Sequence, residues 1–399
     1  MTDQSINQLA CPSCPDRVPA DEEILQYRCG GCGEALRLQL PAPRPFVELV
    51  AAERGLPWRY PELVPVQYEP ELDDHVLPRV VRSPQLESRL GVAEVWLVDG
   101  TALGTGTFKD FEAAIVLAAA KQHGLRRVSV HSTGNTALAY RHYAQRAGVS
   151  CAGYLPRLNV DKLGDITADP EQPLYAIDCA YAELSAKAKA AAAADGRVHL
   201  APFDWKLEGK SVLASVIYEA APQVDTIVQT VAGGYGPLGF EVGFERLSQV
   251  VDTPAGVLCD RRYRLYQPGD ADTLTWAWQH GIDRIEDSEL RLPEDPFEPT
   301  LQSTNPVATL PQLRAGLPVG STLESVPPKT VEDLRPVVDE ILAEAGIALD
   351  YQREKSGYIS LTGLLKSEFD PAARLAVVVS GSRAFAAPAG PGSWHLAGN

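Results

Sequence analysis

The sequence has no long apolar segment and no excess of basic residues. None of its hydrophobic runs approaches the roughly 20 residues that a membrane-spanning helix needs, and residues 1–5 lack the basic-then-apolar order of a signal peptide. We therefore expect a cytoplasmic protein. The formal net charge is −16, with 36 Lys and Arg against 52 Asp and Glu, and a field of this sign repels phosphate backbones and anionic lipid. We expect neither nucleic acid nor a membrane as a partner.

The common nucleotide-binding motifs are also missing. The glycine-rich stretch at residues 232–239 (AGGYGPLG) has neither the GxGxxG form of dinucleotide-binding folds nor the lysine of a P-loop. NAD and ATP are therefore poor candidates for its ligand. A small anion responds to local geometry more than to the net charge of the whole molecule, so an anionic substrate stays compatible with this composition.

Four of the seven cysteines stand in two close pairs near the N-terminus. Cys11 and Cys14 form one CxxC pair, and Cys29 and Cys32 form the other. Each pair can present two thiolates from one tight turn, and four thiolates complete a tetrahedral zinc site. The spacing predicts a zinc ribbon with structural Zn²⁺. Because four thiolates fill the coordination shell, we expect no open metal position for chemistry.

Beyond this segment the pattern is that of a soluble α/β protein. At 399 residues the chain is too long for one ordinary core, and 45% hydrophobic with 22% charged residues is typical of globular domains. Residues 41–84 are rich in proline and aromatics, so we expect a linker packed along the main body and no long helix there. Residues 270–326 are punctuated by proline and give no clear assignment.

Strand and helix patterns alternate from residue 95 onward. We predict strands at 95–98, 127–131, 151–155, 174–177, 226–231 and 374–379, and helices at 111–123, 137–147, 181–194, 212–221, 240–247, 331–345 and 359–366. Such alternation is typical of doubly wound parallel sheets, which bind ligands at the carboxyl ends of their strands. The loops at 132–136 and 232–239 fall at such ends.

Lys109 is the main candidate for a reactive side chain. It follows a glycine- and threonine-rich turn and precedes a helical pattern, where desolvation among small residues would lower its pKa and make the amine nucleophilic. A lone lysine at a helix start is usually a solvated surface residue. The glycine-rich loop, however, offers backbone N–H groups and a helix N-terminus to a phosphate. An amine for an aldehyde, a phosphate cradle and a polar loop together suit pyridoxal 5′-phosphate.

The order of four motifs resembles the pyridoxal-phosphate enzymes of the tryptophan synthase β fold, and most of all threonine synthase. These motifs are residues 105–110 (TGTFKD), 132–136 (STGNT), the glycine-rich loop and 377–382 (VVVSGS). The resemblance implies two doubly wound open-sheet domains with a small N-terminal zinc ribbon. We accordingly expect the ribbon at 1–40, a linker and the start of the large cofactor domain at 41–100, a small α/β domain at 101–210, and the large domain at 211–399.

The resemblance also implies roles for individual residues. Lys109 would bind the cofactor aldehyde and later carry the Cα proton, Asn135 would hydrogen-bond the cofactor's 3′-oxygen, and Ser380 would face the pyridine nitrogen. The cofactor phosphate would lie in the glycine-rich loop, against Gly233, Gly234, Gly236 and Gly239. The substrate carboxylate would be held by Ser132, Thr133 and Thr136.

Two departures from threonine synthases bear on the substrate. Those enzymes usually carry Lys-Asp-Arg-Gly at the reactive lysine, and this chain has Lys109-Asp110-Phe111-Glu112. Their phosphate-gripping Ser, Asn and Arg are replaced within residues 201–206 (APFDWK), so Lys206 would offer the substrate a point charge in place of a forked guanidinium. The Phe-Lys-x-x-Glu-Ala pattern is closer to cysteate synthase, which uses O-phosphoserine and sulfite.

We therefore predict elimination or replacement at Cβ or Cγ of an activated, O-phospho amino acid, with a second small nucleophile. A cysteate synthase-type reaction and true threonine synthase activity are both open alternatives. A binding or regulatory protein that keeps the fold without turnover is the alternative of another class. By the same resemblance we expect a homodimer.

Overall fold

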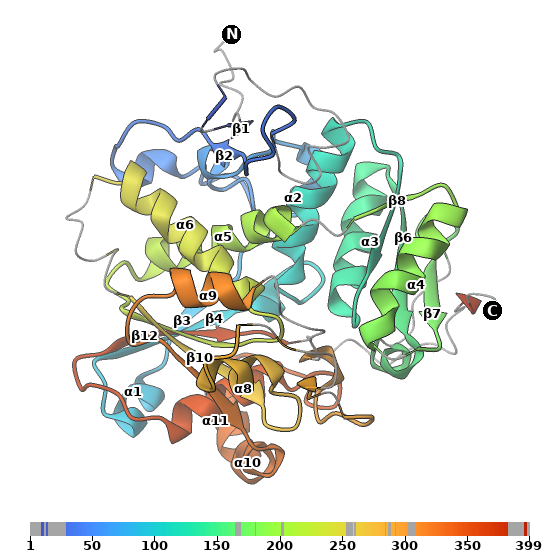
Figure 1. Ribbon diagram of the computed structural model, residues 1–399. Coiled ribbons are helices and arrows are strands. Elements are labelled where there is room, and N and C mark those ends of the chain that lie inside the picture. The colour runs from blue at the N-terminus through green and yellow to red at the C-terminus, as the bar shows by residue number, and fades with distance from the viewer. Residues whose placement is uncertain are drawn as a thin grey trace.

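The computed structural model describes residues 9–11, 13–14, 29–163, 169–179, 181–200, 203–252, 258, 261–283, 285, 289–291, 293–301, 309–381 and 395–396. Two open β-sheets form the frame of this structure, and helices cover both of them (Figure 1). The mixed α/β fold predicted from the sequence is confirmed. Within these ranges, no helix is both long enough and apolar enough to span a membrane.

The larger sheet has six strands in the order β11-β10-β9-β12-β4-β3. Its neighbouring strands run parallel except at the edge, where β3 pairs antiparallel with β4. Because β12 lies between β9 and β4, its carboxyl end lies in the middle of the sheet. The bounds are β3 Arg79–Arg82, β4 Glu94–Asp99, β9 Thr226–Thr230, β10 Arg262–Pro268, β11 Thr322–Val326 and β12 Arg374–Val379.

The second sheet has five parallel strands in the order β13-β7-β6-β5-β8. A separate antiparallel pair, β1 with β2, belongs to the cysteine-containing N-terminal segment. The bounds are β1 Leu9–Ala10, β2 Arg37–Leu38, β5 Arg127–His131, β6 Ser150–Pro156, β7 Leu174–Ile177, β8 Val198–His199 and β13 His395–Leu396.

Helices cover both faces of the larger sheet. In Figure 1, α10 and α11 lie below this sheet, α5 and α6 lie above it, and α2 lies between it and the second sheet, which is flanked by α3 and α4. The bounds are α1 Pro84–Leu90, α2 Lys109–Gln122, α3 Asn135–Ala147, α4 Tyr181–Ala194, α5 Phe203–Ala220, α6 Tyr235–Val250, α8 Thr273–Gln279, α9 Leu310–Gly316, α10 Pro328–Glu344 and α11 Ser356–Lys366.

Strand β12 shows why the central strands are apolar throughout. Leu375, Val377 and Val379 contribute to the core under α10 and α11, whereas Ala376 and Val378 contribute to the core under α5 and α6. All five side chains are fully buried. A strand covered on both faces has no polar side, which is why its sequence reads as a continuous apolar run.

The proline-rich segment at 41–84 contains no long helix, as predicted. It forms short 3₁₀ turns, and Trp58 and Tyr60 bury their rings in the main core. The 3₁₀ turns are Phe46–Leu49, Pro61–Leu63 and Pro70–Leu72, with further ones at Gly100–Ala102, Arg157–Leu163 and Pro299–Leu301. The strand β3 at its end is not apparent from the sequence.

Several helices begin two or three residues earlier than predicted, but α5 and α6 begin nine and five residues earlier. The predicted helices start at residues 212 and 240, but α5 begins at Phe203 and α6 at Tyr235. Glycines cause the difference, because they lie inside these helices where backbones approach closely. A Cβ added at Gly209 would lie 2.5 Å from the Cα of Glu112 in α2, and one at Gly239 would lie 2.4 Å from the Cβ of Lys210 in α5. Gly243, within the predicted part of α6, approaches α5 in the same way, since its added Cβ would lie 2.2 Å from the carbonyl oxygen of Ser211. Glycines, which are typical of loops, therefore lie in this protein at the points where two helices cross closely.

We expect Gly243→Ala to lower the free energy of unfolding by about 2 kcal/mol, because α6 must shift away from α5 to admit the methyl group. The measurement is urea unfolding of the purified protein. Gly316→Ala is the matched control, since it also adds a methyl group to a helix but meets nothing within 4 Å. Equal effects of the two substitutions would contradict the close-approach explanation.

Candidate active site

A cavity of about 170 Å³ lies at the carboxyl ends of β9 and β12, in the middle of the larger sheet. Open α/β sheets bind their ligands at this position. The lining comes from the starts of α2, α3, α6 and α11, from the middle of α5 and from the loops after both strands. It consists of residues 107–109, Thr133, Asn135, Thr136, Lys210, Leu213, 229–236, Thr300, Leu301, Glu354, Ser356, Ser380 and Gly381.

Lys109 is the first residue of α2, and its side chain lines the cavity. The preceding turn is held by Asp110, whose carboxylate accepts hydrogen bonds from the Thr105 hydroxyl and, at 2.8 Å, from the Thr105 backbone N–H. Burial raises the pKa of the Asp110 carboxyl to about 6, although both hydrogen bonds favour its charged form. The helix start that presents Lys109 is therefore fixed by local hydrogen bonds.

The glycine-rich loop leads directly into the N-terminus of α6. Gly234 occupies the N-cap position with φ +83°, no side chain caps the helix, and its first turn contains no acidic residue. The first N–H groups of a helix have no intrahelical partner, so they are available to an anion in the cavity. Beside them, the buried Oε1 of Gln229 accepts no hydrogen bond from any described residue.

Another part of the cavity lining is joined by a chain of polar contacts between Asn135, Glu354, Ser356 and Ser380. Asn135 donates a hydrogen bond from Nδ2 to the Glu354 carboxylate, which also accepts one from the Ser356 hydroxyl. The same hydroxyl lies 3.1 Å from the carbonyl oxygen of Ser380. Glu354 is only 4% exposed. Glu354 is not apparent as a site residue from the sequence, because a single acidic residue outside any motif carries no signal.

Eight of the predicted site residues line this one cavity. They are Lys109, Thr133, Asn135, Thr136, Gly233, Gly234, Gly236 and Ser380. Residues predicted from four separate stretches of sequence therefore lie around a common space.

The other three predicted residues, Ser132, Gly239 and Lys206, lie outside the lining. The Ser132 hydroxyl accepts hydrogen bonds from the N–H groups of Gly134 at 2.9 Å and Ala137 at 3.1 Å, so it stabilises the start of α3. Gly239 lies inside α6, where an added Cβ would be 2.4 Å from the Cβ of Lys210. Lys206 lies on α5, one helical turn before Lys210.

Lys210 and Glu112 form a buried ion pair in the cavity wall. The Lys210 Nζ lies 2.5 Å from Glu112 Oε2, and the Lys206 Nζ lies 3.8 Å from Glu112 Oε1. Burial lowers the pKa of Lys210 to about 8, against the opposing effect of Glu112. Burial alone would raise the pKa of Glu112, but Lys210, Lys206 and Lys109 outweigh it and lower the pKa to about 2. Lys210 is not apparent from the sequence, because the predicted helix begins at residue 212, after this lysine.

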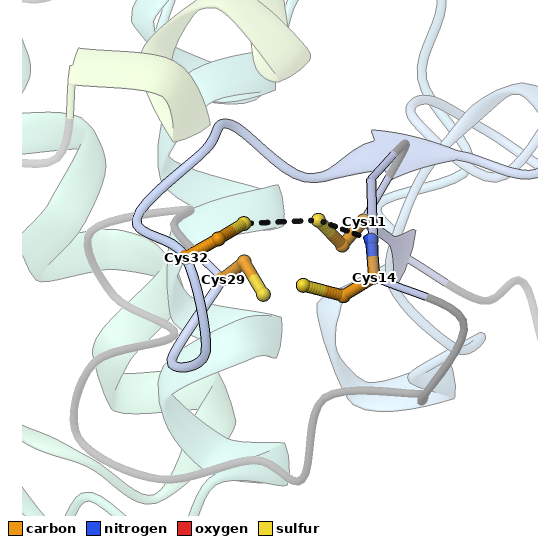
Figure 2. Close-up of side chains that lie close together, drawn as sticks. All are labelled: Cys11, Cys14, Cys29 and Cys32. Atoms are coloured by element: carbon orange, nitrogen blue, oxygen red, sulfur yellow. Dashed lines mark hydrogen bonds between the residues drawn. The ribbon is translucent and has the colours of Figure 1, made fainter.

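The four N-terminal cysteines converge as predicted. The Sγ atoms of Cys11, Cys14, Cys29 and Cys32 all lie within 4.8 Å of one another and point to a common centre (Figure 2). The Cys11 and Cys32 sulfurs are 3.4 Å apart, much farther than the roughly 2 Å of a disulfide bond. Four sulfurs around one centre could hold a tetrahedral metal ion at ordinary metal–sulfur distances.

Residues 77–307 match the family model of pyridoxal-phosphate dependent enzymes. The chain belongs to this family. Membership implies pyridoxal phosphate as the cofactor, and the matched region contains Lys109, Asn135 and the glycine-rich loop.

Curated relatives include enzymes of two kinds. The threonine synthase of Methanocaldococcus jannaschii is 31% identical over 151 residues, which cover 37% of this chain and 37% of that protein. The cysteate synthase of Methanocella paludicola is 28% identical over 164 residues, covering 39% and 36%. The chain thus matches little more than a third of the length of either relative.

Solved structures of the same fold match far more of the chain. Maize serine racemase superposes with a TM-score of 0.59 at 20% identity, covering 77% of this chain and 90% of that one. The processed form of threonine deaminase isoform 2 from Solanum lycopersicum gives 0.59 at 17% identity, covering 87% and 94%. At such identities the likeness shows the fold, and it confirms the fold class that the sequence resemblance implies.

Proposed function

We propose that this enzyme catalyses elimination or replacement at Cβ or Cγ of an activated, O-phospho amino acid. The observation that carries the proposal is the convergence of Lys109, the uncapped N-terminus of α6 and the Asn135 and Ser380 wall on a single cavity. An amine, an anion site and polar groups for an aromatic ring are the partners that pyridoxal phosphate needs.

The donors of the cavity fit that cofactor. Lys109 would hold its aldehyde, and Gly233, Gly234 and Gly236, at the start of α6, would hold its phosphate. Asn135 would bind the ring oxygen, with its amide already oriented by Glu354, and Ser380 would face the ring nitrogen. When bound, the cofactor draws electrons away from the substrate's Cα and so acidifies the Cα–H bond.

The chain's own residues then supply binding and proton transfer. Lys109 is the base placed to remove the Cα proton. Thr133 and Thr136, in the loop at the start of α3, would hold the substrate carboxylate. A hydroxyl at Ser380, unlike a carboxylate, does not favour a protonated ring nitrogen, which suits elimination and replacement better than transamination.

Positive charge at the α5 wall supports an anionic substrate. Lys206 and Lys210 both lie within ion-pair distance of Glu112, and Lys210 lines the cavity. O-phosphoserine with sulfite as the second substrate, and O-phosphohomoserine with water, are the two versions that the sequence resemblance to cysteate synthase and threonine synthase implies. Glu112 belongs to the Phe-Lys-x-x-Glu-Ala pattern that is closer to cysteate synthase, and this favours the first version.

We further propose that the four-cysteine cluster binds a structural Zn²⁺. The cluster lies in the N-terminal segment, away from the cavity lining, and four thiolates leave no open coordination position. The metal would stabilise a segment whose described strands, β1 and β2, are too short to be stable alone.

Substrate class can be tested by product release from the cofactor-loaded enzyme. We expect inorganic phosphate to be released from O-phosphoserine or O-phosphohomoserine, and acetate from O-acetylserine to be released more slowly, because the lysine-lined wall favours the dianionic leaving group. Lys109→Arg should release neither. Absence of phosphate release from both O-phospho amino acids would contradict the proposal.

Metal content can be measured by elemental analysis of the purified chain. We expect about one equivalent of zinc in the wild type and loss of most of it in Cys29→Ser, because three thiolates leave the shell incomplete. Cys151→Ser, which replaces a buried cysteine outside the cluster, is the control and should keep its zinc. A Cys29→Ser protein with full metal content would show that these four residues do not form the site.

A further inference from the structure

Helices α2 and α5 bring three lysines and one carboxylate together beside the cavity, and two of these lysines, Lys109 and Lys210, line it. Lys109 and Glu112 stand one turn apart on α2, and Lys206 and Lys210 stand one turn apart on α5. Glu112 is 2% exposed at its side chain, so its charge is removed from water. Within 4.0 Å of either α5 lysine, Glu112 is the one carboxylate that the described residues provide.

The cluster therefore has more positive than negative charge. Lys210 is only 8% exposed, and a buried ammonium group is costly unless it is paired and hydrogen-bonded. Lys210 shares its partner, because the Glu112 carboxylate also faces Lys206. All three lysines lower the pKa of Glu112. Lys109 has no ion pair with any residue in the described ranges. A bound anion would balance the excess charge.

Lys210 is the α5 lysine that faces the place where an anion would lie. The Nζ atoms of Lys206 and Lys210 lie 5.7 Å and 6.0 Å from the ring centre of Tyr235, the first residue of α6. Of the two lysines, however, Lys210 alone lines the cavity, as Tyr235 does. The Cβ of Lys210 lies directly against Gly239 of α6. Because α6 packs on the base of the Lys210 side chain, the ammonium group emerges beside the uncapped helix N-terminus, which attracts anions itself.

We propose that Lys210 is an oxyanion-binding residue of this cavity and that Glu112 positions it. The inference rests on the proposed function and adds a residue to it. The ligand is a phosphate- or sulfite-type oxyanion, supplied either by the cofactor's phosphate or by the amino-acid substrate and its co-substrate. Glu112 is held in turn by the Tyr140 hydroxyl, which donates to Oε1 at 3.4 Å.

The test compares wild type, Lys210→Met and Lys210→Arg in equilibrium titrations of the full chain followed by absorbance. The probes are pyridoxal phosphate, pyridoxal without its phosphate, and O-phosphoserine added to the cofactor-loaded protein. If Lys210 binds the cofactor's phosphate, Lys210→Met weakens pyridoxal phosphate about tenfold or more and leaves pyridoxal unchanged. If it binds the substrate's oxyanion, only the O-phosphoserine titration weakens by that factor.

Two controls separate oxyanion binding from a structural role. Lys121→Met removes an ion-paired lysine from the other end of α2, and it should change no titration. The double variant Glu112→Gln/Lys210→Met removes the carboxylate that Lys210→Met would leave unpaired. It should stay as weak as Lys210→Met. Recovery of wild-type affinity in the double variant would show that repulsion by Glu112 caused the loss, and would overturn the inference.

The pH dependence gives a second readout. Glu112 and Lys109 face Lys210 from α2, Lys206 from its own helix, Tyr235 from α6, and Tyr140 from α3 through Glu112. An ammonium binds an anion only while protonated, so the wild-type affinity should fall above about pH 8, where Lys210 loses its proton. Lys210→Arg should keep its affinity there, because a guanidinium stays charged.

The outcomes separate this inference from the proposed function. If the wild type binds pyridoxal phosphate and Lys210→Met binds all three probes within about twofold of it, the role of Lys210 is refuted and the proposed function stands. A wild type that fails to bind pyridoxal phosphate would refute the proposed function itself.

Discussion

The close crossing of α5 with α2 and α6 is the constraint on which the site depends. Gly209 lets the α5 backbone approach Glu112 of α2, and Gly243 lets α6 approach Ser211 of α5. A buried ion pair reinforces the contact between α5 and α6, because both terminal guanidinium nitrogens of Arg246 lie 2.5 Å from the Glu208 carboxylate oxygens. The crossing brings Lys109, Lys210 and the first turn of α6 to the same cavity, although more than 120 residues separate the first from the last.

The crossing also connects the N-terminal segment to the site. Strand β2 and its neighbours line a cavity of about 270 Å³ together with the N-terminal half of α5 and the C-terminal half of α6. Asp204 and Glu208 face this second cavity, whereas Lys210 faces the first. Helix α5 thus has the cysteine-containing segment on one side and the candidate active site on the other. Its position is the physical link between them.

The charges show how an acidic protein can bind anions. The net charge of −16 gives a repulsive field at long range, yet α2 and α5 together place three lysines around a single carboxylate. At short range and away from water, these local charges and the N-terminus of α6 outweigh the distant ones. A negative net charge is therefore compatible with the binding of a small oxyanion.

Much of the fold and part of the site are predictable from the sequence. Strands β5, β7 and β12 and helix α4 have the predicted bounds, because local patterns set them: alternating valines in β5, apolar runs in β7 and β12, and a helical alanine pattern in α4. Lys109 and Asn135 are found through motif order. The early starts of α5 and α6 are not predictable, since glycines such as Gly209 and those of α6 are typical of loops in a sequence. Only the structure shows that they lie where two helices approach closely. The same error hides Lys210, and only tertiary contacts bring Glu354 to Asn135.

The central claim is that Lys109, among the lysines of this cavity, carries the cofactor. The most direct measurement is borohydride reduction of the cofactor-loaded protein, followed by digestion and mass spectrometric location of the pyridoxyl group. We predict a single modified lysine at position 109. Modification of Lys210 in place of Lys109, or of no lysine at all, would contradict the account.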